Sequence, residues 1–320
     1  MMRGAKTLLD GCASLKAGET VLVVTDTKMT AIAEVIAAAA YERSAEPVIV
    51  VMKPREMDGQ EPPMLVSEAM KHADLVLSPV TRSITHTKAV KEALESGARI
   101  LVMTAFTQDM MIRGGIEADF KAQQPLCERL AGMFAQAKIL RLSTSAGTQL
   151  TMNVSGRRGN ALTCIVDKPG KFSPVPTIEA NVSPVEGTTE GTIVADASIP
   201  YIGIGLLHEP VNVVVRKGQV VDITGGYQAS ILKTDLEAKK DPNVYNIAEL
   251  GVGFNPKATM TGIMLEDEAV LGSAHIGLGT SITLGVNVKA AIHYDLVLWR
   301  PTIELDGKTV IDNGVLRYSV

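Results

Sequence analysis

The pattern of hydrophobic and polar positions between Thr20 and Leu142 predicts short strands that alternate with helices. Runs suited to buried strands lie at residues 21–24, 47–52, 74–77, 100–103 and 139–142. Stretches with apolar residues at helical spacing lie at residues 29–42, 88–96 and 119–138. Gly97 ends the second of these helices, and Pro125 interrupts the third. Strands separated by helices predict an open parallel sheet covered on both faces.

After Ser143 the pattern changes to short strands separated by turns. Glycine, threonine and valine become frequent, and turn pairs such as Lys217-Gly218 and Asp306-Gly307 punctuate the chain. Hairpins are predicted at residues 211–216 with 219–223 and at 302–305 with 309–311, and the helical signal is limited to about residues 231–239. We therefore expect an α/β, Rossmann-like domain over residues 1–145 and a mainly antiparallel β domain, barrel-like or a sandwich, over residues 146–320.

Composition and charge narrow the class of protein. Of 320 residues, 46% are hydrophobic and 21% are charged, which is ordinary for a soluble globular protein. The formal net charge of −4 offers no basic patch for phosphates, so we expect no nucleic-acid partner. Cys12, Cys127 and Cys164 are sparse and widely spaced, which suggests reduced thiols in a cytoplasmic protein. No signal-peptide core and no run of ~18 apolar residues is present, so no membrane partner is expected either.

A dinucleotide site is excluded by the residues that follow the first predicted strand. That strand leads into Thr25-Asp26-Thr27-Lys28, which has no glycine to admit a pyrophosphate. Gly277-Leu278-Gly279 has the wrong context, because no long helix follows it. The α/β domain therefore lacks the fingerprint of a nucleotide-binding fold.

His86 lies in a hydroxyl-rich segment, residues 78–87, after the third predicted strand. Open α/β sheets place ligands at the carboxyl ends of their strands, and a histidine there can act as a general acid or base. The alternative is that Thr85 or Thr87 caps the following helix and that His86 is simply exposed.

The sequence around His293 and Asp295 predicts a metal site. These two residues are two apart in the strand-like run 290–299, so their side chains point to the same face. Imidazole and carboxylate together are common ligands of Zn, Mn, Co and Fe(II). Because burying such groups unpaired is costly, either an ion binds them or they hydrogen-bond each other.

Two further residues are candidates for the same site. Glu249 has apolar neighbours, and Gly251 and Gly253 beside it allow close backbone approach. His275 lies among small residues, where either a ligand or a neighbouring strand can come close. The acidic run at residues 266–268 is interpreted as a solvated turn.

Six motifs follow one another along the chain: Thr85-His86-Thr87, Pro176-x-x-Glu179-x-x-x-x-Pro184, Glu190-Gly191-Thr192, Ala248-Glu249-Leu250-Gly251-x-Gly253-x-Asn255-Pro256, Ser273-x-His275-Ile276-x-Leu278-Gly279 and His293-x-Asp295. Taken together, these ordered motifs resemble the thermophilic-type metallo-aminopeptidases and their compact relatives, the 2,5-dihydroxypyridine 5,6-dioxygenases. The similarity spans most of the chain and is more specific from Pro176 onward.

The aminopeptidase branch implies a pair of metal ions held by two glutamates, two histidines and an aspartate. The residues that match these ligands are Glu179, Glu249, His275, His293 and Asp295. The tyrosine that this branch carries about seven residues past His275 is missing, because Ser281-Ile282 stands there.

The dioxygenase branch implies one Fe(II) held by two histidines and an aspartate. His293 and Asp295 match two of these ligands, Glu249 stands where the other histidine is expected, and His86 matches the proposed catalytic base. The short chain resembles this branch, whereas the ligand set resembles the aminopeptidases.

Ligand chemistry favours the hydrolytic alternative, because three carboxylates can bridge two ions that activate water. We expect a metal-dependent, aminopeptidase-like hydrolase of terminal or small amide bonds with one or two Zn, Co or Mn ions, and with His86 as a proton shuttle. The alternative is an Fe(II) dioxygenase that cleaves the ring of a dihydroxypyridine-like substrate, and a third is a non-catalytic metal-binding protein. The resemblance also implies a homo-oligomer that acts on a small molecule or short peptide.

Overall fold

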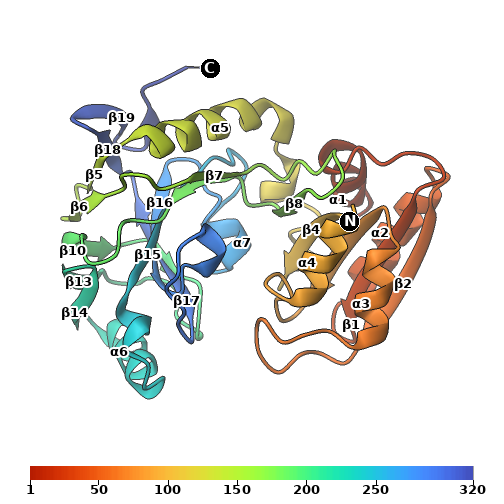
Figure 1. Ribbon diagram of the computed structural model, residues 1–320, viewed down its shortest axis with the longest axis horizontal. Coiled ribbons are helices and arrows are strands. Elements are labelled where there is room, and N and C mark those ends of the chain that lie inside the picture. The colour runs from red at the N-terminus through yellow and green to blue at the C-terminus, as the bar shows by residue number, and fades with distance from the viewer. Residues whose placement is uncertain (320) are drawn as a thin grey trace. The chain divides into compact units, whose positions relative to one another are not determined.

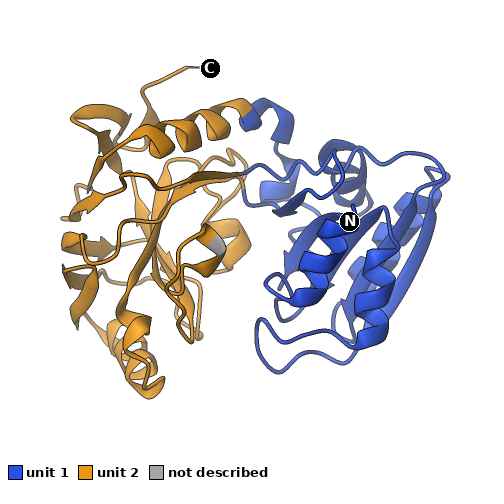
Figure 2. Cartoon of the chain, viewed as in Figure 1, with its two compact units in different colours: residues 1–124, 162–177 blue, residues 125–161, 178–320 orange. Residues whose placement is uncertain are grey.

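The computed structural model describes residues 1–319 and divides into two compact units (Figure 2). The first unit comprises residues 1–124 and 162–177, and the second comprises residues 125–161 and 178–320. The chain therefore passes from one unit to the other after residues 124, 161 and 177. The sequence-based division, 1–145 and 146–320, has a single boundary, and helix α5 (Phe120–Gln136) spans the first passage.

The first unit contains a five-stranded parallel sheet with strand order β2-β1-β3-β4-β8 (Figure 1). Its strands are β1 (Thr20–Asp26), β2 (Glu46–Met52), β3 (Leu75–Val80), β4 (Arg99–Thr104) and β8 (Phe172–Pro174). Its helical elements are α1 (Met2–Lys6), η1 (Thr7–Cys12), α2 (Thr30–Tyr41), α3 (Met64–Lys71), α4 (Lys88–Glu95) and η2 (Gly114–Glu117). The predicted α/β sheet is confirmed for the first four expected strands, with α1, η1, α3, η2 and β8 as additional elements. The expected strand at residues 139–142 does not join this sheet: it is β5 (Ile139–Ser143), which pairs antiparallel with Gln149–Asn153 and Thr302–Leu305 of the second unit.

Burial explains the uninterrupted apolar strands of this unit. Every residue of β3 and β4 is buried, as expected of central strands in a parallel sheet. Val76 and Ile100 pack in one core with Met70 of α3 and Ala93 of α4. The sheet is thereby closed to water along its central strands.

The second unit contains two sheets built by antiparallel pairing. The eight-stranded sheet has the order β14-β13-β10-β6-β5-β18-β19-β20, and the seven-stranded sheet has the order β12-β11-β17-β16-β15-β9-β7. The strands of the first are β5 (Ile139–Ser143), β6 (Gln149–Asn153), β10 (Glu190–Ala195), β13 (Val211–Arg216), β14 (Gln219–Thr224), β18 (Thr302–Leu305), β19 (Lys308–Asp312) and β20 (Val315–Leu316). Both predicted hairpins are confirmed, as β13 with β14 and β18 with β19.

The seven-stranded sheet provides the frame of the candidate site. Its strands are β7 (Gly159–Leu162), β9 (Glu179–Val182), β11 (Ser198–Ile199), β12 (Gly205–Leu206), β15 (Ile247–Gly253), β16 (Ser273–Gly279) and β17 (His293–Trp299). The remaining helical elements of the unit are α6 (Tyr227–Ala238), η3 (Pro242–Tyr245), α7 (Met264–Asp267) and η4 (Ile282–Leu284). All residues of β9, β15 and β16 are buried, so polar side chains there must find partners within the protein or bind an ion.

The predicted architecture, an α/β sheet followed by a β-rich part, is therefore confirmed. Among residues 1–319, no helix combines the length and the apolar character needed to cross a membrane.

Candidate metal centre

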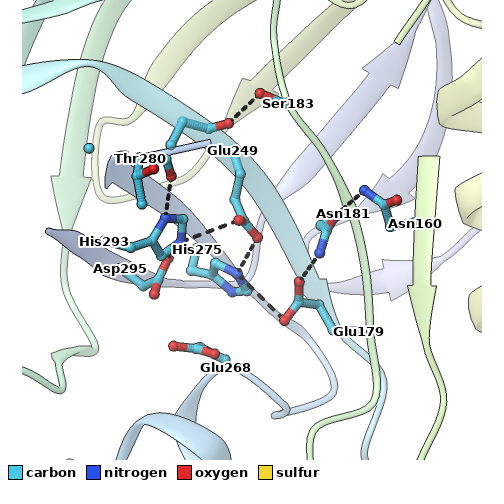
Figure 3. A network of polar contacts seen from close by, with 12 residues as sticks. Asn160, Glu179, Asn181, Ser183, Glu249, Glu268, His275, Thr280, His293 and Asp295 are labelled. Carbon is cyan, nitrogen blue, oxygen red and sulfur yellow. Dashed lines mark hydrogen bonds and ion pairs between the residues drawn. The ribbon is translucent and has the colours of Figure 1, made fainter. Parts of the chain in front are cut away.

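Four neighbouring strands of the seven-stranded sheet bring the five predicted ligands together (Figure 3). Glu249 lies opposite Gly277, and Gly277 lies opposite Asp295, so all three positions share one face. The ligands by strand are Glu179 on β9, Glu249 on β15, His275 on β16, and His293 and Asp295 on β17. The proximity that the sequence predicted is therefore present, and the role of these residues as metal ligands stays a prediction.

A glycine lies opposite each of the five side chains on the neighbouring strand. The pairs are Glu179 with Gly253, Glu249 and Asp295 with Gly277, His275 with Gly251, and His293 with Gly279. A Cβ atom at Gly251 would lie 2.1 Å from His275 Nε2, and one at Gly277 would lie 3.0 Å from His293 Nε2. The glycines therefore leave the space over the sheet that the imidazole rings occupy.

Two groups of polar atoms meet at Glu249. Its Oε1 atom lies 3.4 Å from His275 Nε2, which lies 3.8 Å from Glu179 Oε2. Its Oε2 atom lies 3.3 Å from His293 Nε2, which lies 3.4 Å from Asp295 Oδ1. Candidate ligand atoms of Glu179, Glu249 and His275 all lie within 4.8 Å of one another. Each carboxylate oxygen of Glu249 thus lies beside a different imidazole nitrogen, so an ion could bind the carboxylate and a ring together.

Hydrogen bonds outside this group orient its members. The backbone carbonyl of Thr280 accepts a hydrogen bond from His293 Nδ1 over 2.8 Å, which orients the ring so that Nε2 is directed at the carboxylates. Asn181 donates to Glu179 Oε1 over 2.6 Å, and Asn160 donates to Asn181 over 2.8 Å. Ligand atoms held by a second layer of hydrogen bonds are typical of metal sites.

Burial and mutual charge shift the proton affinities of these groups. Burial raises the pKa of Glu179 to about 8, and the carboxylates of Glu249 and Asp295 add to this effect. Burial alone would also raise the pKa of Glu249, but contacts with His275 and His293 lower it to about 2. Burial alone would lower the pKa of His275, but the carboxylates of Glu179 and Glu249 raise it to about 9. The metal-free centre therefore keeps protons on buried groups at neutral pH.

The acidic run at residues 266–268 is not a solvated turn, and that expectation is wrong. Glu266, Asp267 and Glu268 are all buried at or just after α7. Asp267 Oδ1 accepts a hydrogen bond from the backbone amide of Thr261 over 2.6 Å, so it closes the preceding loop. Glu268 instead contacts Tyr201 next to Asp295. No spacing in the sequence signals this arrangement, because its parts come from distant segments.

His86 belongs to the first unit, where it is exposed and precedes α4. The side chain of Thr87 caps that helix by accepting a hydrogen bond from the amide of Val90. This agrees with the alternative in which Thr87 is the cap and His86 is exposed. The catalytic role of His86 stays a prediction.

Comparisons with known proteins identify relatives over nearly the whole chain. A family model described as NicX, 2,5-dihydroxypyridine 5,6-dioxygenase, matches residues 2–318. A 2,5-dihydroxypyridine 5,6-dioxygenase of Pseudomonas putida KT2440 is 26% identical over 263 residues, which cover 78% of this chain and 73% of the relative.

Two solved structures share the fold. The 2,5-dihydroxypyridine dioxygenase of Pseudomonas putida KT2440 matches with a TM-score of 0.82 and 21% identity, covering 99% of this chain and 96% of that chain. Wild-type AmpT from Thermus thermophilus matches with a TM-score of 0.70 and 14% identity, covering 99% and 98%. At these identities the structural likeness concerns the fold alone.

Proposed function

The chain belongs to the NicX family of 2,5-dihydroxypyridine 5,6-dioxygenases, and we propose that it is an iron(II)-dependent dioxygenase. Its proposed substrate is a dihydroxypyridine or a closely related hydroxylated N-heterocycle, whose ring it opens. The observation that carries this proposal is the match of the family model over residues 2–318.

Family membership corrects the function expected from the ligand set. The expected aminopeptidase-like hydrolase is wrong, because the family model and the curated relative both bear the name of a dioxygenase. The likeness to the Thermus thermophilus protein is limited to the fold. The error has a chemical source: five donors suggested a two-ion hydrolytic centre, although two imidazoles and a carboxylate within that set also suit one iron(II).

The donors of the second unit fit an iron(II) ion. His275 and His293 would supply imidazole nitrogens, and Glu249, which contacts both rings, would supply a carboxylate. Asp295 Oδ1 is buried and has no hydrogen-bond partner among residues 1–319, so an ion would satisfy it. Two histidines and one carboxylate from this set make up the arrangement typical of iron oxygenases.

The proposed reaction places both atoms of one O₂ on the two ring carbons whose bond breaks, so it needs no external reductant. His275, His293 and a carboxylate would hold iron(II), which would supply the activation of O₂ and of the substrate oxygen atoms. Burial keeps water from Glu249, His275 and Asp295, and the Thr280 carbonyl keeps the partly exposed His293 ring oriented. His86 is the proposed acceptor of a substrate hydroxyl proton.

An oxygen-uptake assay tests the proposal. The full chain, loaded with iron(II) without air, is mixed with 2,5-dihydroxypyridine and O₂. We expect one O₂ consumed per substrate and a ring-opened product that carries both atoms of ¹⁸O₂. Metal-free protein and the variant His293→Ala are the controls, and both should consume none. An iron-loaded protein that leaves the substrate intact, or uptake that persists in the controls, would contradict the proposal.

We also propose that the protein acts on a small molecule and forms a homo-oligomer, without nucleic-acid or membrane partners. Light scattering of the purified chain measures the assembly, and a mass equal to one chain would contradict it.

A further inference from the structure

The hydroxyl group of Tyr201 lies at the edge of the candidate metal centre, between two carboxyl groups. It lies 2.5 Å from Asp295 Oδ2 and 3.1 Å from Glu268 Oε1. We propose that Tyr201 is a positioning residue: held by Glu268, it fixes the Asp295 carboxylate so that Asp295 Oδ1 faces the ion.

The two oxygen atoms of Asp295 have different surroundings. Oδ2 accepts the hydrogen bond from Tyr201, whereas Oδ1 lies 3.4 Å from His293 Nε2 and has no hydrogen-bond partner among the described residues. The backbone of Asp295 is fixed by its pairing with Gly277 on β16, so rotation of the side chain is the freedom that remains. Because both oxygens belong to one planar group, a hydrogen bond to Oδ2 sets the direction of Oδ1.

A tight turn holds Tyr201 in place. The amide of Ile204 donates to the carbonyl of Tyr201 over 2.9 Å, and the residues between them, Ile202 and Gly203, have φ values of +49° and +80°. A positive φ is unfavourable for a β-branched residue and costs on the order of 1–3 kcal/mol, so surrounding structure must impose it. Such strained turns cluster at functional sites.

Ring packing and hydrogen bonding fix the tyrosine further. The ring of Tyr201 stacks on that of Tyr294, with centroids 4.9 Å apart. The Tyr294 hydroxyl points elsewhere and donates to Asp235 Oδ2 over 3.0 Å. Tyr294 therefore resembles Tyr201 in packing but does not touch Asp295 through its hydroxyl, which makes it a matched control.

Glu268 completes the arrangement. A tyrosine hydroxyl has one proton, so it cannot donate to both carboxyl groups at once. The shorter contact assigns this proton to Asp295, and Glu268 lies against the Tyr201 oxygen from the other side. A glutamine at this position has an N–H group that can donate to the Tyr201 oxygen, whereas an alanine has no polar group to hold it.

This inference rests on one part of the proposed function, the role of Asp295 as a metal ligand, and not on the substrate. Metal binding without substrate therefore tests it separately. Loss of metal affinity in the right variants would support the inference even if the protein cleaved no dihydroxypyridine.

The experiment compares Tyr201→Phe and Tyr294→Phe in the full chain, using Co²⁺ alone as the probe. Chelator competition measures the affinity, and the visible spectrum of bound Co²⁺ reports its ligand geometry. We expect Tyr201→Phe to weaken binding by about 10–100-fold and to change the spectrum, as for other residues that orient ligands. Tyr294→Phe should stay within about 2-fold of wild type. Unchanged affinity in Tyr201→Phe, or an equal loss in Tyr294→Phe, would overturn the inference.

A second pair of variants keeps the test decisive if Tyr201→Phe does not fold. Glu268→Gln should retain the affinity to within about 2-fold, whereas Glu268→Ala should lose about 10-fold, because only the glutamine holds the tyrosine. Equal affinities in the two variants, whether both are retained or both are lost, would contradict the proposal.

Discussion

Buried aspartates in the two units have opposite surroundings. Asp26 ends β1 in the first unit, where its Oδ2 accepts hydrogen bonds from the amide and hydroxyl of Thr81 at 2.6 and 2.7 Å, and its Oδ1 accepts one from the amide of Lys28 at 2.9 Å. Asp295 lies within β17 in the second unit, and its Oδ1 accepts no hydrogen bond from the described residues. Both side chains are almost fully buried.

The difference separates a structural carboxylate from one that is available to a ligand. Asp26 accepts hydrogen bonds from protein donors at both oxygen atoms and so completes a loop. Asp295 faces an imidazole and other carboxylates, which an ion can bind together. Burial alone therefore does not distinguish the two aspartates, whereas the oxygen atom of Asp295 without a hydrogen-bond partner beside an imidazole nitrogen supports its proposed role as a metal ligand.

The largest expected effect is that of Asp295→Asn on metal binding. The variant keeps the shape of the side chain and removes its charge, so the affinity for Co²⁺ should fall more than about 100-fold, beyond the loss typical of residues that only orient ligands. Chelator competition measures it. His86→Ala in the first unit is the control: its metal affinity should match wild type, while oxygen uptake falls by about 10²–10⁴-fold if it is the base. A Co²⁺ affinity near wild type in Asp295→Asn would remove the distinction between the two aspartates.

A smaller effect is expected where a glycine gives room to a ligand. In Gly251→Ala the new Cβ atom would lie 2.1 Å from His275 Nε2, so the ring must move. We expect about 10-fold weaker Co²⁺ binding and a loss of about 1–3 kcal/mol in the free energy of unfolding. Gly132→Ala on α5 is the matched control, because nothing lies within 4 Å of its added atom and alanine favours a helix. Equal behaviour of the two variants would show that the glycine opposite His275 has no special role.

The pH dependence of metal binding is expected to follow the proton on His275. Its pKa is raised to about 9, so in the metal-free protein the ring is protonated at neutral pH, and an ion must displace that proton. Burial alone would lower the pKa of His293, but Asp295 and Glu249 raise it well above its ordinary value, so this ring must also lose a proton to bind an ion. Affinity for Co²⁺ should therefore rise by at least about tenfold per pH unit around neutral pH. Calorimetric titration in buffers of different ionisation enthalpy measures the released protons. An affinity that stays constant between about pH 6 and pH 8 would rule this out.

The smallest effect on the metal centre is expected from Asp26→Asn. The change replaces a charged acceptor of three hydrogen bonds, so the free energy of unfolding should fall by about 1–3 kcal/mol. Co²⁺ affinity should remain within about 2-fold of wild type. Thermal unfolding and chelator competition on the same sample measure the two quantities. Weakened metal binding with unchanged stability would reverse the roles assigned to the two aspartates.

Much of the fold was predictable from local pattern. The continuous apolar runs of β3 and β4 and the helix before Gly97 follow from burial and from helix-ending residues. Strand β8 was not predicted, because it comes from residues 172–174 and joins β4 only through long-range pairing. No local pattern distinguishes such a strand from an ordinary loop.

The candidate site was predictable only in part. The spacing of His293 and Asp295 placed both on one face of a strand, but the convergence with Glu179 was known only through family resemblance. Tyr201 and Glu268 escaped prediction because they reach Asp295 from a turn and from the end of α7, far away in sequence. Their roles depend on tertiary contacts, which spacing along the chain does not encode.

The pairing of β16 with β17 has a consequence for how this sheet assembles. His293 and Asp295 face the other donors only in the register that sets them opposite Gly279 and Gly277. A slip of one residue would turn both side chains to the opposite face and leave a chain that is folded but unable to capture an ion. Only molecules with correctly aligned strands would then bind the ion, so the metal content of a preparation would report the fraction of correctly assembled protein.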